Sequence, residues 1–302
     1  MARDSRGDVH APLAAHAPAR DGHEAAAPVG RRSLEVGILH YRPGAPVTRE
    51  RRQVLAEAPL LIQVAGGESY TVMRTPGEDR ELALGFLFAE GIVRSLADVR
   101  RISPGCDGGN TVTVELAAPP TRVVRRNLVV SSACGLCGRA DLDALLAELE
   151  SSPRAPAIAL DRLFALPARL RKRQTLFRLT GGSHAAGLFD ARGELLVVGE
   201  DLGRHSALDK VIGRALAEAL PLAELGVILS GRASLEMVVK AARARLGLVV
   251  AVSAPSEAAV TTARRLGISL CGFARGDELA VYTHDRWEGL EASDAVPLPG
   301  PR

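Results

Sequence analysis

Short segments that are apolar at every position alternate with amphipathic helical patterns along the C-terminal half of the chain, and this alternation limits the possible folds most strongly. Residues 226–229 and 248–252 are such apolar segments, which are typical of strands buried on both faces of a sheet. Helical stripes of apolar residues follow them from Leu235 and from Ala259. The pattern predicts a sheet that helices cover on both faces.

The composition suits this kind of packing. The chain has 302 residues, of which 47% are hydrophobic and only 3% aromatic. A chain of this length can bury a large core, and aliphatic side chains must build it. We therefore predict an α/β fold, α+β overall, with a C-terminal three-layer α/β/α domain and a smaller strand-rich N-terminal domain.

The N-terminal half is rich in strand patterns. Residues 60–64 and 69–74 are two predicted strands joined through Gly66 and Gly67, and residues 111–116 alternate polar and apolar side chains. Alternation of this kind indicates strands with one face on the core.

One strong helix is predicted after these first strands. Thr75, Pro76 and Glu78 have the spacing of a capping box with proline at the first helical position. The segment that follows is apolar on nearly every side as far as Phe88, and Gly91 ends it. We expect this helix to be buried.

The pattern divides the chain into five parts. They are a disordered tail over residues 1–30, a strand-rich domain with one buried helix over 31–130, a cysteine loop over 131–138, an α/β domain over 139–290 and a tail over 291–302. The first tail is rich in Ala, Pro, His and Arg without a period, which is typical of disorder.

Charge and cysteine content exclude several classes of protein. The net charge is only +3, with both signs mixed along the chain, so we expect no nucleic-acid partner. No apolar run approaches the roughly 20 residues that span a bilayer, so we expect no membrane segment. Four cysteines do not make a disulfide framework in a chain of this length. We expect a soluble, cytoplasmic protein.

The strongest local motif is a pair of thiols, Cys134 and Cys137, set among small residues in segment 131–138. A thiolate is the nucleophile in sulfur chemistry, and a helix predicted from Asp141 places its N-terminal amides just after the pair, which lowers thiol pKa values. We predict that Cys134 and Cys137 are the catalytic residues and that one of them carries sulfur as a persulfide.

Other interpretations of the pair stay open. A structural zinc site needs further ligands, whereas Cys106 and Cys271 are isolated in the sequence, so we expect no metal site. A thioredoxin-like dithiol fits the strand and helix context only in part. Two inert cysteines are as compatible with the spacing. Cys271 lies in an apolar strand pattern and is interpreted as a packing residue.

Polar turns follow the two apolar strands. Ser230 and Arg232 follow the first strand, and Ser253 follows the second. Ligands of α/β sheets bind at the carboxyl ends of strands, where helix N-termini present free amides to anions. These residues predict a nucleotide-like ligand, with Arg232 as a bidentate donor. The alternative is that the serines only cap helices.

A third motif precedes the helical stripe that begins at Ala207. Segment 200–205 ends in Arg204 and His205, and Asp209 follows one turn later. We interpret this motif as an anion pocket, with Arg204 and His205 as donors, Asp209 as their orienting partner, and segment 180–184 lining the same pocket. The alternative is a solvated helix start.

These motifs together resemble the FdhD family of formate dehydrogenase accessory sulfurtransferases. The likeness covers roughly residues 45–285 and rests on the following segments in one order: 81–87 with 90–92, 134–138, 180–182 with 184–186, 200–205 with 207–210, 230–232, 253–255, 272–273 with 275–276, and 282–284. No single one of these motifs is decisive, but their order is highly specific. The chain departs from the family pattern at Ser206 and Ala274, and neither change threatens the chemistry.

The resemblance implies a function that the spacings do not show. Family members accept sulfur from a cysteine desulfurase and transfer it to the bis(molybdopterin guanine dinucleotide) form of the molybdenum cofactor, before insertion into the catalytic subunit of formate dehydrogenase. The first cysteine, here Cys134, carries the persulfide. Family members are usually homodimers, and the fold of the catalytic half is similar to the cytidine deaminases.

The resemblance also changes the interpretation of one turn. Locally, residues 273–278 predict an ordinary hairpin, but the cofactor-binding stretch of the family matches this segment: Phe273, Ala274, Arg275, Gly276, Asp277 and Glu278.

Two rival functions share features with this sequence. A zinc-dependent base deaminase needs His-x-Glu before Pro-Cys-x-x-Cys, whereas here the cysteines come first and His184 precedes Ala185 and Ala186. Hydrolytic deamination is therefore rejected. A chaperone that binds and inserts the molybdenum cofactor without moving sulfur remains the alternative, because the same pocket serves both roles.

Overall fold

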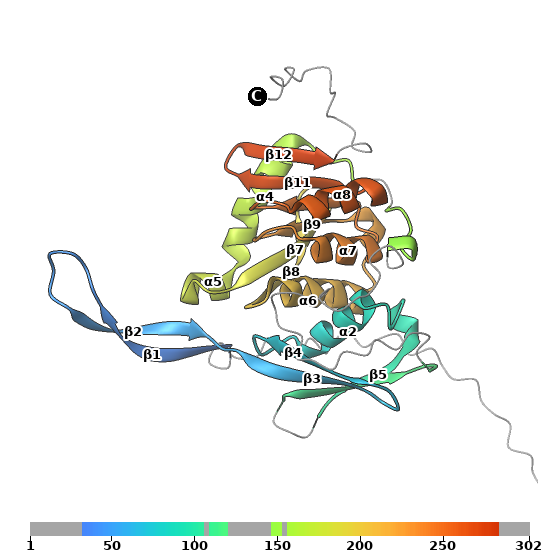
Figure 1. Cartoon of the computed structure of the whole chain (residues 1–302), viewed down its shortest axis with the longest axis horizontal. Coiled ribbons are helices and arrows are strands. Elements are labelled where there is room, and N and C mark those ends of the chain that lie inside the picture. Colours follow the sequence, from blue (N-terminus) through green and yellow to red (C-terminus); the bar gives the residue numbers. More distant parts are fainter. Residues whose placement is uncertain (1–31, 106–108, 120–145, 153–155, 284–302) are drawn as a thin grey trace, which may run out of the picture.

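The computed structural model describes residues 32–105, 109–119, 146–152 and 156–283. Over these residues the protein has a mixed α/β fold, and its strands form a six-stranded, a four-stranded and a two-stranded sheet (Figure 1). The predicted fold class is confirmed.

The six-stranded sheet has the order β12-β11-β10-β9-β7-β8. Its strands are β7 (His184–Phe189), β8 (Leu195–Asp201), β9 (Gly226–Leu229), β10 (Leu248–Ala251), β11 (Ser269–Arg275) and β12 (Glu278–Thr283). β9, β10 and β11 are parallel, while β7 is antiparallel to both β8 and β9. Consequently the ends of β8, β9, β10 and β11 and the start of β7 lie at one edge, which we call the carboxyl edge.

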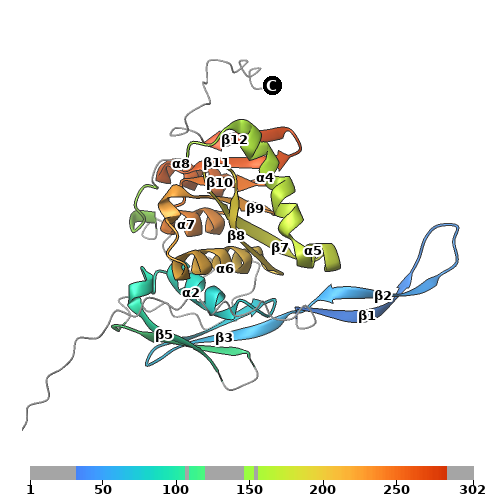
Figure 2. The same cartoon turned by 180° about the vertical axis from the view of Figure 1, so that it is seen from behind.

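Helices cover both faces of this sheet, as the sequence predicts (Figure 1, Figure 2). One face carries α6 (Arg204–Ala217), α7 (Leu235–Arg243) and α8 (Glu257–Leu266). The other carries α4 (Leu160–Arg173), with α5 (Thr175–Thr180) following it. A short 3₁₀ helix, η2 (Leu222–Glu224), precedes β9.

Alternating side chains of the apolar strands explain why both faces are covered. In β9, Val227 and Leu229 belong to the core cluster on the side of α6 and α7, whereas Ile228 belongs to a second cluster with Leu163 and Leu166 of α4. Successive side chains of a strand point to opposite faces, so an unbroken apolar run needs a helical layer on each side.

The four-stranded sheet lies below α6 in Figure 1, with α2 between them. Its order is β4-β3-β6-β5, and its strands are β3 (Ala58–Val64), β4 (Ser69–Arg74), β5 (Val99–Pro104), preceded by η1 (Leu96–Asp98), and β6 (Thr111–Leu116). Helix α2 (Asp79–Ala89) packs one face against this sheet and another against α6, which explains why residues 82–89 are all buried. The predicted burial of this helix is confirmed.

The predicted start of α2 is wrong. The helix begins at Asp79 rather than after a capping box at Thr75, and Glu78 has a left-handed backbone with φ of 57°. Thr75 is used elsewhere: its hydroxyl accepts the N–H of Leu202 at 3.0 Å, and its own N–H donates to Asp201 at 3.0 Å. A tertiary contact thus takes the residue that the local pattern assigned to the helix.

A two-stranded arm projects from the body of the molecule (Figure 1, Figure 2). It consists of β1 (Ser33–His40) and β2 (Thr48–Leu55), which pair in antiparallel register. Leu34 and Leu39 are more than half exposed on it. The sequence places this segment in the strand-rich domain and gives no sign that it separates from the core.

Some expectations fall outside the described residues. The cysteine loop and most of the helix predicted from Asp141 are among them, and the predicted domain boundaries stay predictions. Across the described residues, no helix is long and apolar enough to cross a membrane.

Candidate functional site

The carboxyl edge brings together the polar turns that the sequence predicts as a ligand site. The turn after β9 contains Arg232, the turn after β10 contains Ser253, and α6 begins at Arg204 directly after β8. Backbone bonds join neighbouring turns, from the N–H of Ser253 to the carbonyl of Gly231 at 3.4 Å and from that of Phe273 to the carbonyl of Ser253 at 3.2 Å. Segments far apart in sequence therefore form one continuous polar edge.

Arg204 is the first residue of α6 and lies at the positive end of that helix. Its Nε is buried and has no hydrogen-bond partner among the described residues. A buried guanidinium N–H without a partner costs free energy unless something binds it. Within the described part of the chain, Arg204 therefore has an unsatisfied N–H and brings positive charge to the start of α6.

His184 faces the same cations from the start of β7. Burial of the ring lowers the pKa of His184 below its ordinary value of 6.5, and the charges of Arg204 and Arg232 lower this pKa further, while Asp201 acts in the opposite direction. The ring packs so closely on Gly231 that a Cβ there would lie 3.1 Å from Nδ1 of His184. The sequence predicts that segment 180–184 lines the anion pocket. The structure places His184 between the start of α6, which contains Arg204, and the turn after β9, which contains Arg232.

His205 has a partner that the sequence did not reveal. Its Nε2 lies 3.3 Å from a carboxylate oxygen of Glu236, in the first turn of α7, and both side chains are nearly buried. Glu236 thus fixes the orientation of the imidazole. Its sequence position gives no signal of this role, because the contact joins two different helices.

Asp209 is not the orienting partner of Arg204 and His205, so that prediction is wrong. Both of its carboxylate oxygens accept hydrogen bonds of 2.6 Å from Lys240 of α7. Asp209 points from the inner face of α6 toward α7, whereas Arg204 and His205 lie one turn earlier. Lys240 lies at helical spacing from Glu236 and Arg243 rather than on the apolar stripe of α7, so the sequence gives no signal that it is buried in a pair.

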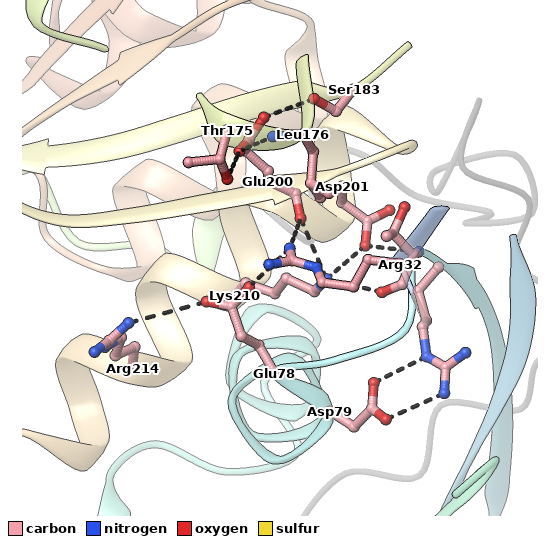
Figure 3. Close-up of polar contacts among 12 residues, drawn as sticks. Arg32, Glu78, Asp79, Thr175, Leu176, Ser183, Glu200, Asp201, Lys210 and Arg214 are labelled. Atoms are coloured by element: carbon pink, nitrogen blue, oxygen red, sulfur yellow. Dashed lines mark hydrogen bonds and ion pairs between the residues drawn. The ribbon is translucent and has the colours of Figure 1, made fainter. Parts of the chain in front are cut away.

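Glu200 and Asp201 organise the site rather than bind at it (Figure 3). Glu200 accepts the N–H groups of Leu176 and Phe177, each at 2.9 Å, and so caps α5. Asp201 is fully buried, pairs with Lys210 at 2.8 Å and accepts the N–H of Gly203 at 2.9 Å. Glu200 thus ties the end of β8 to α5, and Asp201 ties it to α6, so the chain just before Arg204 is held in place.

The serines at the carboxyl edge differ in what they do. Ser256 caps α8, because its hydroxyl accepts the N–H of Ala259 at 3.2 Å. Ser230 is not a helix cap: its hydroxyl accepts the N–H of Ala185 at 2.8 Å and ties the start of β7 to the end of β9. Ser253 lies in the turn before α8 and also caps no helix.

The 273–278 turn extends the carboxyl edge. Phe273 has φ of 51° and is 44% exposed, whereas the side chain of Ala274 is buried in the core. Arg275 donates from Nε to the carbonyl of Val252 at 2.9 Å and holds the turn against the end of β10. The hairpin is closed by pairing of Arg275 with Glu278, and Gly276 and Asp277 form its tip.

The predicted catalytic residues Cys134 and Cys137 lie outside the described residues, as does Cys106. Cys271 is described and is fully buried in β11, where burial raises the pKa of its thiol to about 12. A thiol of this kind is almost never ionised at neutral pH, which agrees with its interpretation as a packing residue. Within the described ranges, no cluster of three His, Cys, Asp or Glu side chains could hold a metal ion.

Comparisons with known proteins identify relatives along most of the chain. The family model described as FdhD/NarQ matches residues 55–287. A protein named sulfur carrier protein FdhD from Mycolicibacterium paratuberculosis is 44% identical over 259 residues, which is 82% of this chain and 95% of the relative. The protein of the same name from Streptomyces coelicolor is 42% identical over 268 residues, which is 84% of this chain and 95% of the relative.

A solved structure has a similar fold. It is a Desulfotalea psychrophila protein described as a candidate formate dehydrogenase accessory protein, with a TM-score of 0.69 and 23% identity, and the match covers 84% of this chain and 99% of that one. The fold likeness and the extent of the sequence matches agree, and the chain belongs to the FdhD/NarQ family.

Proposed function

We propose that this protein is a sulfur carrier that accepts sulfur from a cysteine desulfurase on Cys134 and transfers it to the bis(molybdopterin guanine dinucleotide) form of the molybdenum cofactor, for insertion into formate dehydrogenase. Family membership supports the sulfur carrier role, since relatives over 40% identical bear that name. The cofactor is the substrate of this transfer.

The observation that carries the proposal is the convergence of cationic donors and strand-end turns at the carboxyl edge. Each nucleotide half of this substrate contains a pyrophosphate, and arginine guanidinium groups and helix N-termini are the usual protein partners of such anions. Arg204 offers a buried, unpartnered Nε among the described residues, and Arg232 lies on the neighbouring turn. Ser230, Ser253, His205 and residues 273–278 complete the proposed binding surface.

Sulfur loading follows from thiol chemistry. The thiolate of Cys134 attacks the outer sulfur of the desulfurase persulfide, the sulfur–sulfur bond there breaks, and the desulfurase cysteine leaves as a thiolate. Cys134 then bears the persulfide. The thiolate of Cys137, in the same motif, attacks the inner sulfur of Cys134, so that a disulfide forms between the two cysteines and the persulfide bond breaks. The outer sulfur leaves at the sulfide level and passes to the cofactor at the carboxyl edge.

The test is mass spectrometry of the protein after incubation with a cysteine desulfurase and cysteine. We expect a sulfur adduct on Cys134, loss of that adduct in Cys134→Ala, and loss of formate dehydrogenase activity in cells that carry only this variant. The matched control is Cys271→Ala, because this thiol is buried and un-ionised. Full formate dehydrogenase activity with Cys134→Ala would refute the proposal.

The experiment also separates the rival functions. A chaperone that only binds and inserts the cofactor predicts cofactor binding without an adduct on Cys134. A dithiol redox protein predicts a reversible disulfide between Cys134 and Cys137 and no cofactor binding. A cytoplasmic location and a homodimer belong to the same proposal, and fractionation and sedimentation measure them directly.

A further inference from the structure

We propose that His184 is a ligand-contacting residue of the carboxyl edge, and that its imidazole takes up a proton from solvent when a phosphate or pyrophosphate group binds between Arg204 and Arg232. The inference rests on the proposed function in one respect, the identity of the ligand as a pyrophosphate diester. It does not depend on sulfur transfer.

The position of His184 follows from the sheet topology. β7 is antiparallel to both of its neighbours, so its first residue lies beside the last residue of β8 and beside the turn after β9. In this register His184 pairs with Asp201 of β8, and Ala186 pairs with Leu229 of β9. Ser230 fixes this arrangement through the N–H of Ala185. The imidazole is therefore part of the same edge as the two arginines, although they come from other elements.

The His184 ring lies close against Gly231. Gly231 has no side chain, and a Cβ at that position would lie 3.1 Å from Nδ1 and 3.3 Å from Cε1 of His184. A methyl group at position 231 would therefore press on the ring, which would have to move by a few tenths of an ångström.

The charges around His184 make it sensitive to an anion. Burial lowers its pKa first, then the charges of Arg204 and Arg232, and only Asp201 opposes them. Asp201 is already neutralised by Lys210 at 2.8 Å. The free edge therefore has two cations and a neutral imidazole, and a bound dianion compensates the cations and favours the imidazolium, which adds a third charged donor.

The sign of the pH dependence follows. If the pKa of His184 is higher in the complex than in the free protein, binding is coupled to proton uptake between the two pKa values, and affinity rises as pH falls through that window. Affinity is constant at pH values above the pKa in the complex.

Isothermal titration calorimetry in buffers of different ionisation enthalpy measures this uptake. The probes are P1,P2-di(guanosine-5′) pyrophosphate, a diester, and inorganic sulfate, because the charges of neither change near neutral pH. At about pH 6 we expect proton uptake by the wild type, none by His184→Asn, and affinity about tenfold lower in this variant, a difference that shrinks at about pH 8.

Two further variants make the result specific. His40→Asn removes a histidine of the projecting arm, which is paired with Glu50 at 2.9 Å, and should leave proton uptake unchanged. Gly231→Ala keeps His184 but presses on its ring, and should lower affinity less than His184→Asn does while retaining proton uptake. NMR of the His184 ring in the wild type, with and without sulfate, gives the same answer without a variant: we expect its pKa to rise on binding.

The outcomes are distinct. Equal proton uptake by wild type and His184→Asn, or binding of neither probe by the wild type, would overturn the inference. Binding of sulfate with His184-dependent uptake but no binding of the dinucleotide would uphold the role of His184 and refute the cofactor part of the proposed function. The Cys134 adduct tests sulfur transfer independently of both.

Discussion

Gly85 of α2 and Gly213 of α6 lie at the point where these two helices cross, and neither position has room for a side chain. A Cβ on Gly85 would lie 1.9 Å from the carbonyl oxygen of Asp209, and a Cβ on Gly213 would lie 1.9 Å from that of Glu81. The backbones are therefore in direct contact. This crossing joins the layer of the four-stranded sheet to the helices that shape the carboxyl edge.

Alanine at either glycine should destabilise the protein strongly. The added methyl group meets backbone atoms, which cannot move without separating α2 from α6, so we expect a loss of about 3 kcal/mol or more in the free energy of unfolding. Urea denaturation measures it. Gly37→Ala is the control, since a Cβ there has nothing within 4 Å, and a Gly85→Ala protein as stable as this control would contradict the close crossing.

The Asp209–Lys240 pair should respond unequally to loss of its two members. Burial lowers the pKa of Lys240, but the charges of three carboxylates, Asp209, Glu236 and Glu90, all favour its protonated form and so raise this pKa overall. Lys240→Met leaves these carboxylates facing one another in the core and should cost about 3–5 kcal/mol of unfolding free energy. Asp209→Asn leaves Lys240 within 4.0 Å of Glu236 and should cost clearly less; equal losses in urea denaturation would argue against this view of the cluster.

The same aspartate predicts a pH dependence of stability. Burial raises the pKa of Asp209 from 3.8 to about 6, although Lys240 offsets part of this effect. Between these values the folded protein binds more protons than the unfolded chain, so this group lowers the free energy of unfolding as pH rises from about 4 to about 6, by on the order of 3 kcal/mol. Subtracting the stability profile of Asp209→Asn from that of the wild type should isolate this decrease; a difference that is flat or rises with pH would contradict it.

Asp201→Asn should weaken both the fold and the carboxyl edge. Asp201 accepts from Thr75, Gly203 and Lys210 while fully buried, and its replacement leaves the Lys210 ammonium without its counter-charge. We expect a loss of about 3–5 kcal/mol in unfolding free energy and weaker binding of the dinucleotide probe, because Arg204 follows this anchor directly.

Asp161→Asn is the control for this change. Asp161 is exposed on α4 and its pair with Arg162 is 3.7 Å long, so its loss should change stability by less than about 1 kcal/mol. Similar losses in both variants would show that Asp201 is not the anchor.

Much of the fold and part of the site followed from local patterns. The apolar runs of β9 and β10, the helical stripes after them and the alternation of β6 are properties of short segments, and the structure has all of them near the predicted positions. The meeting of the turns of Arg232 and Ser253 at one edge also followed, since parallel strands end on the same side. That Arg204 joins them was not predicted, because it depends on β7 running antiparallel between β8 and β9. The buried thiol of Cys271 followed from its apolar neighbours.

Other features depend on contacts between segments that no local pattern encodes. Thr75 has the signature of a helix start, yet it bonds to Asp201 and Leu202 because tertiary hydrogen bonds outweigh a cap. Asp209 faces Lys240 rather than His205 because α7 supplies a closer charge.

By itself the sequence determined which elements form, which faces they bury and to which family the chain belongs, because propensity, periodicity and motif order are carried by neighbouring residues. Only the tertiary structure decided the partners of the buried charges, the crossing at Gly85 and the place of His184 between two arginines. The physical reason is that these depend on the antiparallel direction of β7 and on the distance between helices, which are set by packing of the whole core.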